Sequence, residues 1–157
     1  MPRRAGERLH FRKATLDDGD LLLTWRNDPE TIVGSISQRA VTTDEHERWF
    51  AAAIRDPSIV LLIASSDRME VGMVRFEVRS GETWEISVTV APEHRHKGLG
   101  TEMIKAATID FVNEHPGARV LARVLAANER SRKAFERAGY ELLEQDHALL
   151  TMGYPPP

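Results

Sequence analysis

Residues 95–101 combine positive charge with two closely spaced glycines, directly before a segment whose apolar residues have helical spacing. A glycine-rich turn that enters a helix leaves backbone N–H groups without partners and points the positive end of the helix dipole outward. Such a turn binds phosphate or pyrophosphate groups. Glycines let the backbone approach the anion closely, and cationic side chains beside them add attraction. The residues that we predict to hold this anion are Arg95, His96, Lys97, Gly98, Leu99, Gly100 and Thr101.

The order of the glycines argues against two other phosphate-binding turns. A dinucleotide-binding turn needs Gly-x-Gly-x-x-Gly after an early strand, with an acidic residue about 20 positions later, and a P-loop needs Gly-x-x-x-x-Gly-Lys-Ser/Thr. The chain contains neither pattern at this turn, which lies past its middle. Taken alone, the turn also suits an ordinary connection between a strand and a helix.

A second segment, residues 128–140, has the pattern of a complete helix with both of its ends. Asn128 suits an N-cap, and Gly139 suits the left-handed residue that ends a helix. Each of these residues, taken singly, is explained by helix structure alone. One face of the helix carries the residues expected to point inward, which are Ser131, Ala134, Phe135 and Ala138.

Together, the Arg-x-x-Gly-x-Gly turn at 95–100 and the helix at 128–140 resemble the GNAT (GCN5-related) N-acetyltransferases, over nearly the whole chain. Within that family the chain looks most like the branch that acetylates nucleotide-linked amino sugars or, in a close relative, ribosomal proteins. The resemblance implies an α/β (α+β) fold. Its central mixed sheet is mostly antiparallel, is flanked by helices and contains two splayed strands between which acetyl-CoA binds.

The resemblance further implies that acetyl-CoA is the acyl donor and that no metal takes part. The pantetheine arm would pair with the backbone of residues 87–90, as an added strand would. The N–H group of Val88 or Val90 would polarise the thioester carbonyl and stabilise the tetrahedral oxyanion. From the other wall, Asn128 and Ser131 would contact the pantetheine or the phosphates, and we place Phe135 in the same set.

Transfer also requires a base, because an ammonium group cannot attack a thioester. Glu85 shares the polar face of its strand with Ser87 and Thr89, so we predict that Glu85 is the general base. An exposed strand carboxylate without a catalytic role is the alternative. The catalytic set that we predict is Glu85, Ser87 and Val88.

Phe135 marks a departure from the family pattern, since many members have a tyrosine there that protonates the departing thiolate. Either another group supplies that proton, or coenzyme A leaves as a thiolate that solvent protonates. A thiol pKa of about 8.5 makes the solvent route feasible. Tyr140 lies past the end of the helix, where we expect it to contribute packing.

The acceptor amine is expected to meet the segments around residues 25–29, 45–50 and 72–76. Aromatic rings there suit stacking on a sugar, and arginine suits bidentate binding of a diphosphate. A core position for each Trp, an ion pair of Arg26 with Asp28 or Glu30, and an inner helix face for His46 are the alternatives. The predicted acceptor residues are Trp25, Arg26, Asn27, His46, Trp49 and Arg75.

We therefore predict an acetyl-CoA-dependent N-acetyltransferase in which a primary amine attacks directly in a ternary complex. The favoured acceptor is the 4-amino group of a nucleotide-linked sugar. A peptide Nα-acetyltransferase and a non-catalytic acyl-CoA sensor are the alternatives. Similar proteins are commonly homodimers, but no exposed apolar stripe in the sequence requires one.

Composition sets the remaining expectations. A chain of 157 residues with net charge −3 suits one domain (1–157), with loose tails at 1–7 and 153–157, and does not favour nucleic acid as a partner. The absence of cysteine excludes a cysteinyl acyl-enzyme, and the six histidines lack metal-ligand spacing. No apolar stretch approaches the roughly 20 residues of a membrane span, and no secretory signal is evident, so we expect no membrane partner and a cytoplasmic location.

Periodicity and end signals predict the elements that position these residues. The apolar run at 59–64 suits a strand covered on both faces, and the strands at 71–78 and 83–90 should continue it as an antiparallel meander. Asp28-Pro29 should end or interrupt the first helix. The other expected elements are a strand at 9–14, helices at 16–28, 42–55, 99–115 and 128–139, a strand at 120–125 and a hairpin at 141–152.

Overall fold

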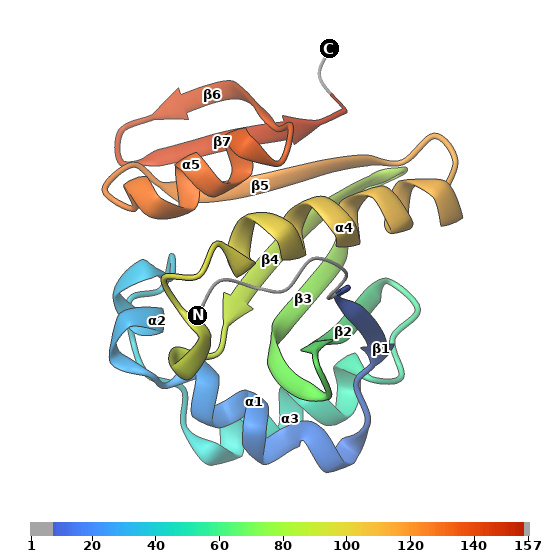
Figure 1. Cartoon of the computed structure of the whole chain (residues 1–157), viewed down its shortest axis with the longest axis vertical. Coiled ribbons are helices and arrows are strands. Elements are labelled where there is room, and N and C mark those ends of the chain that lie inside the picture. The colour runs from blue at the N-terminus through green and yellow to red at the C-terminus, as the bar shows by residue number, and fades with distance from the viewer. Residues whose placement is uncertain (1–7, 156–157) are drawn as a thin grey trace.

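One seven-stranded sheet organises the protein, whose computed structural model describes residues 8–155 (Figure 1). Its strand order is β1-β2-β3-β4-β5-β7-β6, and only the β4–β5 pair is parallel. The expected mixed, mostly antiparallel α/β fold is confirmed. The strands are β1 (His10–Lys13), β2 (Ile59–Ser66), β3 (Met69–Ser80), β4 (Thr83–Val90), β5 (Arg119–Leu125), β6 (Glu141–Asp146) and β7 (Leu149–Tyr154).

Helices cover both faces of this sheet. In Figure 1, α4 crosses in front of the strands, while α1 and α3 lie below β2 and β3. Among the described residues, no helix is long and apolar enough to cross a membrane. The helices are η1 (Leu16–Asp18), α1 (Gly19–Arg26), α2 (Pro29–Gly34), α3 (Thr43–Ala53), η2 (Pro92–His94), α4 (Leu99–Glu114) and α5 (Glu129–Arg137).

The larger apolar cluster lies between the sheet and α4. Val74 and Phe76 of β3 pack there against Met103 and Phe111 of α4, and all four side chains are almost fully buried. The rings of Phe76 and Phe111 stack with their centroids 4.1 Å apart. Alternation along β3 puts these apolar side chains on one face and leaves the charged ones for the other.

The smaller cluster lies on the opposite face, where α1 and α3 cover β2. Trp25 and Phe50 pack there against Leu61 and Ile63. Other residues of β2 contribute to the larger cluster, so the strand is apolar on both faces. This two-sided burial confirms the interpretation of the apolar run at 59–64.

Local end signals were reliable guides to the helices. The Thr42 hydroxyl accepts the backbone N–H of Glu45 at the start of α3, and the Asn128 carboxamide oxygen accepts that of Ser131 at the start of α5. Gly139, just past α5, has φ = 101°, the left-handed region that favours glycine. The last two features confirm the N-cap predicted at Asn128 and the helix end predicted at Gly139.

Two expectations about the ends of elements need correction. Asp28-Pro29 ends α1 as predicted, but it also begins α2, because the Asp28 carboxylate accepts the N–H groups of Glu30 and Thr31. The expected loose tail begins later than residue 153, since Tyr154 pairs with Val120 in β7. The tail expected at 1–7 lies outside the described residues, as do residues 156–157.

Candidate active site

Strands β4 and β5 separate along their length, and this divergence is the centre of the candidate site. β4 pairs with β3 over its whole length, but its pairing with β5 is limited to Thr83–Glu85 against 119–121. In Figure 1 the two strands lie together at the right and separate toward the left. The remainder of β4, residues 86–90, therefore has an edge that no strand of the described chain covers.

The direction of the backbone N–H groups on this edge follows from one hydrogen bond. Ala91 donates its N–H to the carbonyl of Val71, on the β3 side. Successive N–H groups of a strand point to opposite edges. The N–H groups of Val90 and Val88 therefore point to the edge from which β5 has separated, as the sequence led us to expect.

The turn that follows β4, residues 92–98, is named the phosphate loop here. It ends at Gly98, the N-cap of α4, which has φ = 75°, a conformation that strongly favours glycine. His96 also has a positive φ, 63°, and both His96 and Lys97 are exposed. The side chain of Leu99 is 4% exposed and anchors the helix start in the core. The first-turn amides of α4 are thus presented at a fixed position, as an anion site requires.

Arg95 is the exception within this loop. Its guanidinium lies 2.7 Å from the Asp28 carboxylate, donates to the hydroxyl of Thr31 at 2.8 Å and lies 3.2 Å from the Glu30 carboxylate. Its side chain is only 14% exposed. These contacts with Asp28 and the first turns of α2 do not favour the expectation that the charge of Arg95 serves the phosphates.

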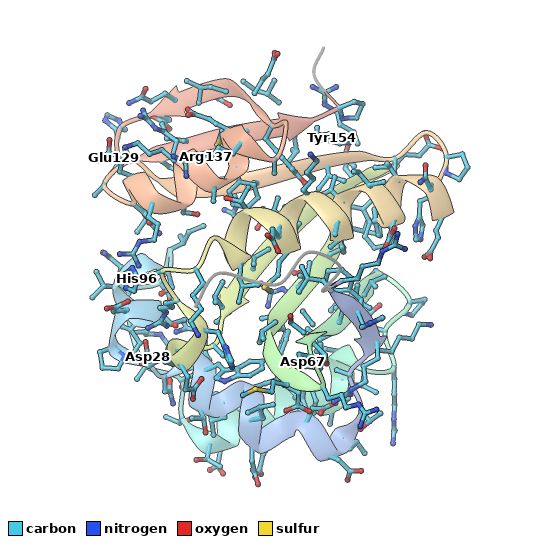
Figure 2. All side chains as sticks on the ribbon, viewed as in Figure 1. Asp28, Asp67, His96, Glu129, Arg137 and Tyr154 are labelled. Atoms are coloured by element: carbon cyan, nitrogen blue, oxygen red, sulfur yellow. The ribbon has the colours of Figure 1, made fainter. Side chains whose placement is uncertain are left out.

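The start of α5 lies on the side of the molecule toward which β4 and β5 separate. Figure 2 shows Glu129, His96 and Asp28 on the same side of the molecule, the side toward which β4 and β5 separate. Asn128 caps α5 and Ser131 is half-buried in its first turn. Both stay predicted contacts for the acyl donor.

Phe135 is buried, 5% exposed, and its ring meets that of Tyr140 edge-on. The Tyr140 hydroxyl pairs with the Thr108 hydroxyl at 2.8 Å in the core, and burial raises the pKa of Tyr140 above its usual value. Tyr140 is thus a packing residue, as expected, and a poor source of a proton for a leaving thiolate.

Glu85 sits at the last β4–β5 pair and is buried, 7% exposed. Its carboxylate accepts two hydrogen bonds from Arg79 of β3, at 3.1 and 3.0 Å, and two from Arg123 of β5, at 2.6 and 3.2 Å. We name Arg79, Glu85 and Arg123 the vertex triad, because they join β3, β4 and β5 where the divergence begins.

The vertex triad changes the proton affinity of Glu85. Desolvation by burial would raise its pKa, but the hydrogen bonds and charges of Arg123 and Arg79 outweigh that effect and hold the pKa of Glu85 below its usual value. A carboxylate with four charged donors is a weak proton acceptor. These surroundings do not favour the predicted role of Glu85 as general base.

Sequence analysis missed both partners of Glu85. Arg79 continues the alternation of Arg75 and Glu77 on the polar face of β3, so extending that pattern by one step would have found it. Arg123 could be found only from the β4–β5 register, which places Leu121 opposite Glu85 and Arg123 two residues further along β5. Register between distant strands is not readable from the chain.

Arg75 stands directly opposite Ser87 in the β3–β4 register, beside the edge of β4 that pairs with β3. Its guanidinium stands over the ring of Trp49, with the central carbon 5.3 Å from the ring centroid, and donates to the Ser87 hydroxyl at 3.3 Å. The Nε atom is buried and has no hydrogen-bond partner, and the nearest carboxylate, that of Glu77, is 3.9 Å away.

Arg26, the last residue of α1, also has a buried guanidinium nitrogen without a hydrogen-bond partner. One terminal nitrogen donates to the Ser37 hydroxyl at 2.8 Å, while the other, Nη1, is buried without a hydrogen-bond partner. Burial is the largest cause that lowers the pKa of Arg26 and of Arg75. The charge of Arg39 lowers the pKa of Arg26 further. For Arg75, Glu77 and Glu85 raise the pKa, and Arg79 and Arg26 lower it. Arg26 and Arg75 are called the arginine pair below.

Three other predicted acceptor residues have structural roles. Trp25 is 3% exposed in the smaller cluster, so its ring offers almost no surface for stacking. The Asn27 carboxamide donates to the Val41 carbonyl and accepts the Val41 N–H, both at 2.7 Å. It therefore fastens the segment after α2 to the end of α1.

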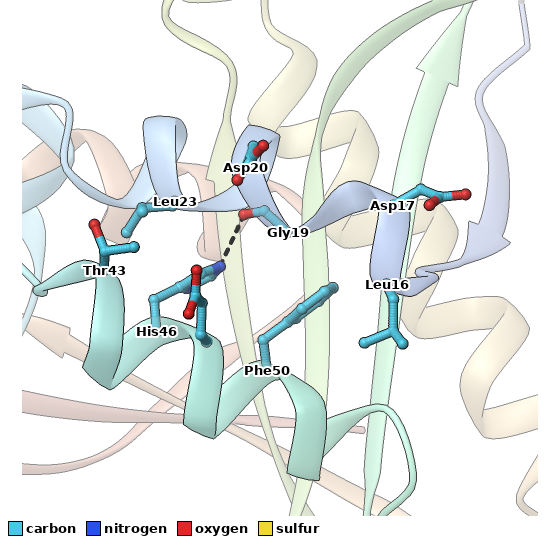
Figure 3. Close-up of a pocket in the computed structure, with 9 residues that line it drawn as sticks. Leu16, Asp17, Gly19, Asp20, Leu23, Thr43, His46 and Phe50 are labelled. Carbon is cyan, nitrogen blue, oxygen red and sulfur yellow. Dashed lines mark hydrogen bonds between the residues drawn. The ribbon is translucent and has the colours of Figure 1, made fainter.

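His46 is the third. Its Nε2 lies 2.8 Å from the Gly19 carbonyl, and its ring stacks on that of Phe50 (Figure 3). The residues around it line a cavity of about 440 Å³ between η1, α1 and α3, to which β4, α4 and α5 contribute no residue.

Within the described part of the chain, no group of three or more His, Cys, Asp or Glu residues could hold a metal ion.

Comparisons with known proteins agree with this geometry. The sequence model of a family described as "Acetyltransferase (GNAT) domain" matches residues 8–141. No curated protein matches the chain by sequence.

Several solved structures share the fold. A domain from Methanocaldococcus jannaschii superimposes with a TM-score of 0.82 at 20% identity, covering 94% of this chain and 97% of that one. Aminoglycoside acetyltransferase AAC(6')-Ib, in complex with coenzyme A and kanamycin, gives a TM-score of 0.80 at 18% identity, covering 93% and 94%. Spermidine N-acetyltransferase from Vibrio cholerae, in complex with coenzyme A and spermine, gives 0.79 at 15% identity, covering 92% of each chain.

Proposed function

The chain belongs to the GNAT acetyltransferase family and uses acetyl-CoA as acyl donor, and from that premise we propose that it transfers the acetyl group directly to a primary amine in a ternary complex. The observation that carries this proposal is the unpaired edge of β4 at residues 86–90, followed at once by a helix N-terminus that Gly98 caps. The first feature suits a thioester arm and the second its pyrophosphate. The sequence contains no cysteine, so a cysteinyl acyl-enzyme is excluded.

The chain's own groups support the transfer as follows. The N–H group of Val88 or of Val90 binds the thioester oxygen and stabilises the negative charge that it gains when the amine nitrogen bonds to the carbonyl carbon. The carbon–sulfur bond then breaks, and coenzyme A leaves as a thiolate. Water takes one proton from the acceptor ammonium before the attack and a second from the same nitrogen as the amide forms. Solvent protonates the thiolate, since Phe135 has no hydroxyl. Glu85 holds the strands in position in this scheme and takes no proton.

The favoured acceptor is the amino group of a nucleotide-linked sugar. The arginine pair suits a diphosphate, and the half-buried ring of Trp49 suits a sugar or base face. A peptide N-terminus is the alternative acceptor. Amines of the kind bound by the aminoglycoside and spermidine enzymes are a third class, which the shared fold brings into consideration.

The test is release of coenzyme A from acetyl-CoA by the purified protein, with four acceptor panels at matched concentration. The panels are nucleotide-linked amino sugars, short peptides with free N-termini, aminoglycosides, and polyamines. Turnover on the sugars supports the favoured acceptor, and turnover only on another panel replaces it while keeping the chemistry. Acetyl-CoA binding without turnover on any amine would instead favour the acyl-CoA sensor.

A further inference from the structure

We propose that the acceptor amine carries an anionic group, a carboxylate or a phosphate, and that Arg75 and Arg26 bind this group beside the reacting nitrogen. The inference rests on the proposed function and names the substrate class of the same site. It separates this protein from acetyltransferases of the same fold whose bound acceptors are polycations.

Arg75 has hydrogen-bond capacity that the protein leaves unused. A guanidinium offers five N–H donors in a planar fork. Of these, the structure pairs one nitrogen with Ser87, at 3.3 Å, and leaves the buried Nε without a partner. A buried donor that has lost its water and gained no acceptor is unfavourable. A ligand with two adjacent oxygen atoms would complete these hydrogen bonds.

Arg26 has the same deficiency at Nη1, which is buried and unpartnered. The charges of Arg79 and Arg26 act against the charged form of Arg75, while those of Glu77 and Glu85 act in its favour. An anion held by the unpartnered donors of Arg75 and Arg26 would add to the favourable side.

The surrounding charges do not supply that anion. Glu85 is held by Arg79 and Arg123, and Glu45 is paired with Arg39 at 3.2 Å. Glu77 lies 3.9 Å from Arg75, at the limit of an ion pair. The region consequently holds two more positive charges than negative ones. The groups counted are Arg26, Arg39, Arg75, Arg79 and Arg123 against Glu45, Glu77 and Glu85.

The position of Arg75 relates this excess of positive charge to the reaction. Arg75 stands opposite Ser87, and Ser87 directly precedes Val88, whose N–H points to the unpaired edge. An anion held by Arg75 would thus lie close to the transferred acetyl group, with the ring of Trp49 as one wall. Spermine and kanamycin carry several ammonium groups, which the arginine pair would repel.

The test compares acceptors that differ only in the anion. The phosphate arm pairs glucosamine 6-phosphate with glucosamine, and the carboxylate arm pairs phenylalanine with phenylalaninamide. We expect at least a tenfold higher kcat/KM for the anionic member of one pair, and the arm in which it occurs identifies the anion. Equal rates within both pairs, or a preference for the neutral member or for spermidine, would overturn the proposal.

Substitutions test whether Arg75 and Arg26 cause the preference for the anionic acceptor. Arg75→Gln should remove most of the preference by slowing the anionic acceptor at least tenfold and the neutral one less than threefold, and Arg26→Gln should act in the same direction. Arg75→Lys keeps the positive charge but not the planar set of guanidinium N–H donors, so it should retain part of the preference for the anionic acceptor. Arg48→Gln, at an exposed position of α3, is the matched control and should change nothing. Equal slowing of both members by Arg75→Gln would count against a role in anion binding.

A binding measurement separates this inference from the proposed function. Calorimetry with the same four acceptors, on protein saturated with coenzyme A, reports the acceptor site because the phosphate loop is then occupied. If no amine is acetylated, the proposed function fails, yet the anion site stands if an anionic member binds and Arg75→Gln abolishes that binding. Absence of binding by all anionic members would refute the site itself.

Discussion

Arg95 in the phosphate loop and Arg75 on β3 are both largely buried, with side chains 14% and 27% exposed, but their surroundings differ. Arg95 contacts two carboxylates and a hydroxyl of α2. Arg75 has a long hydrogen bond to Ser87, an aromatic ring and an unpartnered Nε. From sequence alone, both were assigned to ligands.

The difference shows that a basic residue near a binding site is informative only when its partners are known. Since α2 binds Arg95, anion binding in the phosphate loop depends on backbone amides at the start of α4, with His96 and Lys97 as exposed additions. Since the buried Nε of Arg75 lacks an acceptor, its region is the one suited to a charged ligand. The four predictions below test this contrast.

The largest effect is expected for Glu85, because its carboxylate is bound by two arginines of the protein itself. Glu85→Gln should lower the free energy of unfolding by about 3 kcal/mol, at the low end for a broken buried ion pair because Arg79 and Arg123 are partly exposed. It should lower kcat less than tenfold, whereas loss of a general base typically costs about 10²–10⁴-fold. Thermal unfolding and steady-state kinetics measure the two effects.

The pH dependence of that variant is a second measurement. Because the folded protein depresses the pKa of Glu85, its stabilisation is present above its ordinary pKa of 4.5 and is lost as the pH falls through the folded value. The unfolding free energies of the wild type and Glu85→Gln should therefore converge in acid. Glu141→Gln, at an exposed position of β6, is the control. A large fall in kcat with unchanged stability would restore Glu85 as the base.

The next effect concerns the backbone of the phosphate loop. Gly98→Val forces a β-branched residue to φ = 75°, or else turns the α4 amides away from the anion. A cost of about 2 kcal/mol for this conformation corresponds to a rise in the KM for acetyl-CoA of roughly 30-fold if the loop rearranges. Gly81→Val, in the turn between β3 and β4, carries similar backbone strain away from the loop and should leave that KM unchanged.

A smaller effect is expected for Arg95→Gln. The loss of its contacts with α2 should lower the free energy of unfolding by about 1 kcal/mol. The KM for acetyl-CoA should stay within about twofold, because the guanidinium is already bound to Asp28 and Thr31. Arg137→Gln, on the exposed side of α5, is the control. A tenfold rise in that KM without loss of stability would show that Arg95 serves the phosphates after all.

The smallest effect is expected for Lys97→Gln. An exposed cation contributes little through water, so the KM for acetyl-CoA should rise about two- to threefold at low salt and less at high salt. Kinetics at two ionic strengths measure this. An effect that is large and independent of salt would mean that Lys97 makes a direct, desolvated contact.

Sequence predicted the parts of this molecule that depend on nearby residues. Caps such as those at Thr42 and Asn128 involve partners three positions away, and the stop at Gly139 depends on its own φ. The two-sided burial of β2 follows from its continuous apolar run, and the polar face of β4 follows from alternation along that strand. These features fixed the fold class and the position of the phosphate loop.

The rest depended on partners distant in sequence. His46 bonds to Gly19, Asn27 to Val41 and Arg95 to α2, at separations that no local pattern encodes. Each of these side chains has a type that also suits ligand binding, so composition could not distinguish the two uses. Only the fold shows which donors remain free.

The vertex triad should affect how the stability of this region changes on heating. It joins three strands through Arg79, Glu85 and Arg123, whereas the same strands are held elsewhere by apolar side chains. The cost of removing charged groups from water falls as temperature rises, while the contribution of apolar burial levels off. Heating should therefore destabilise the ion pairs of the vertex triad, where β4 and β5 separate, less than it destabilises the apolar contacts on the two faces of the sheet.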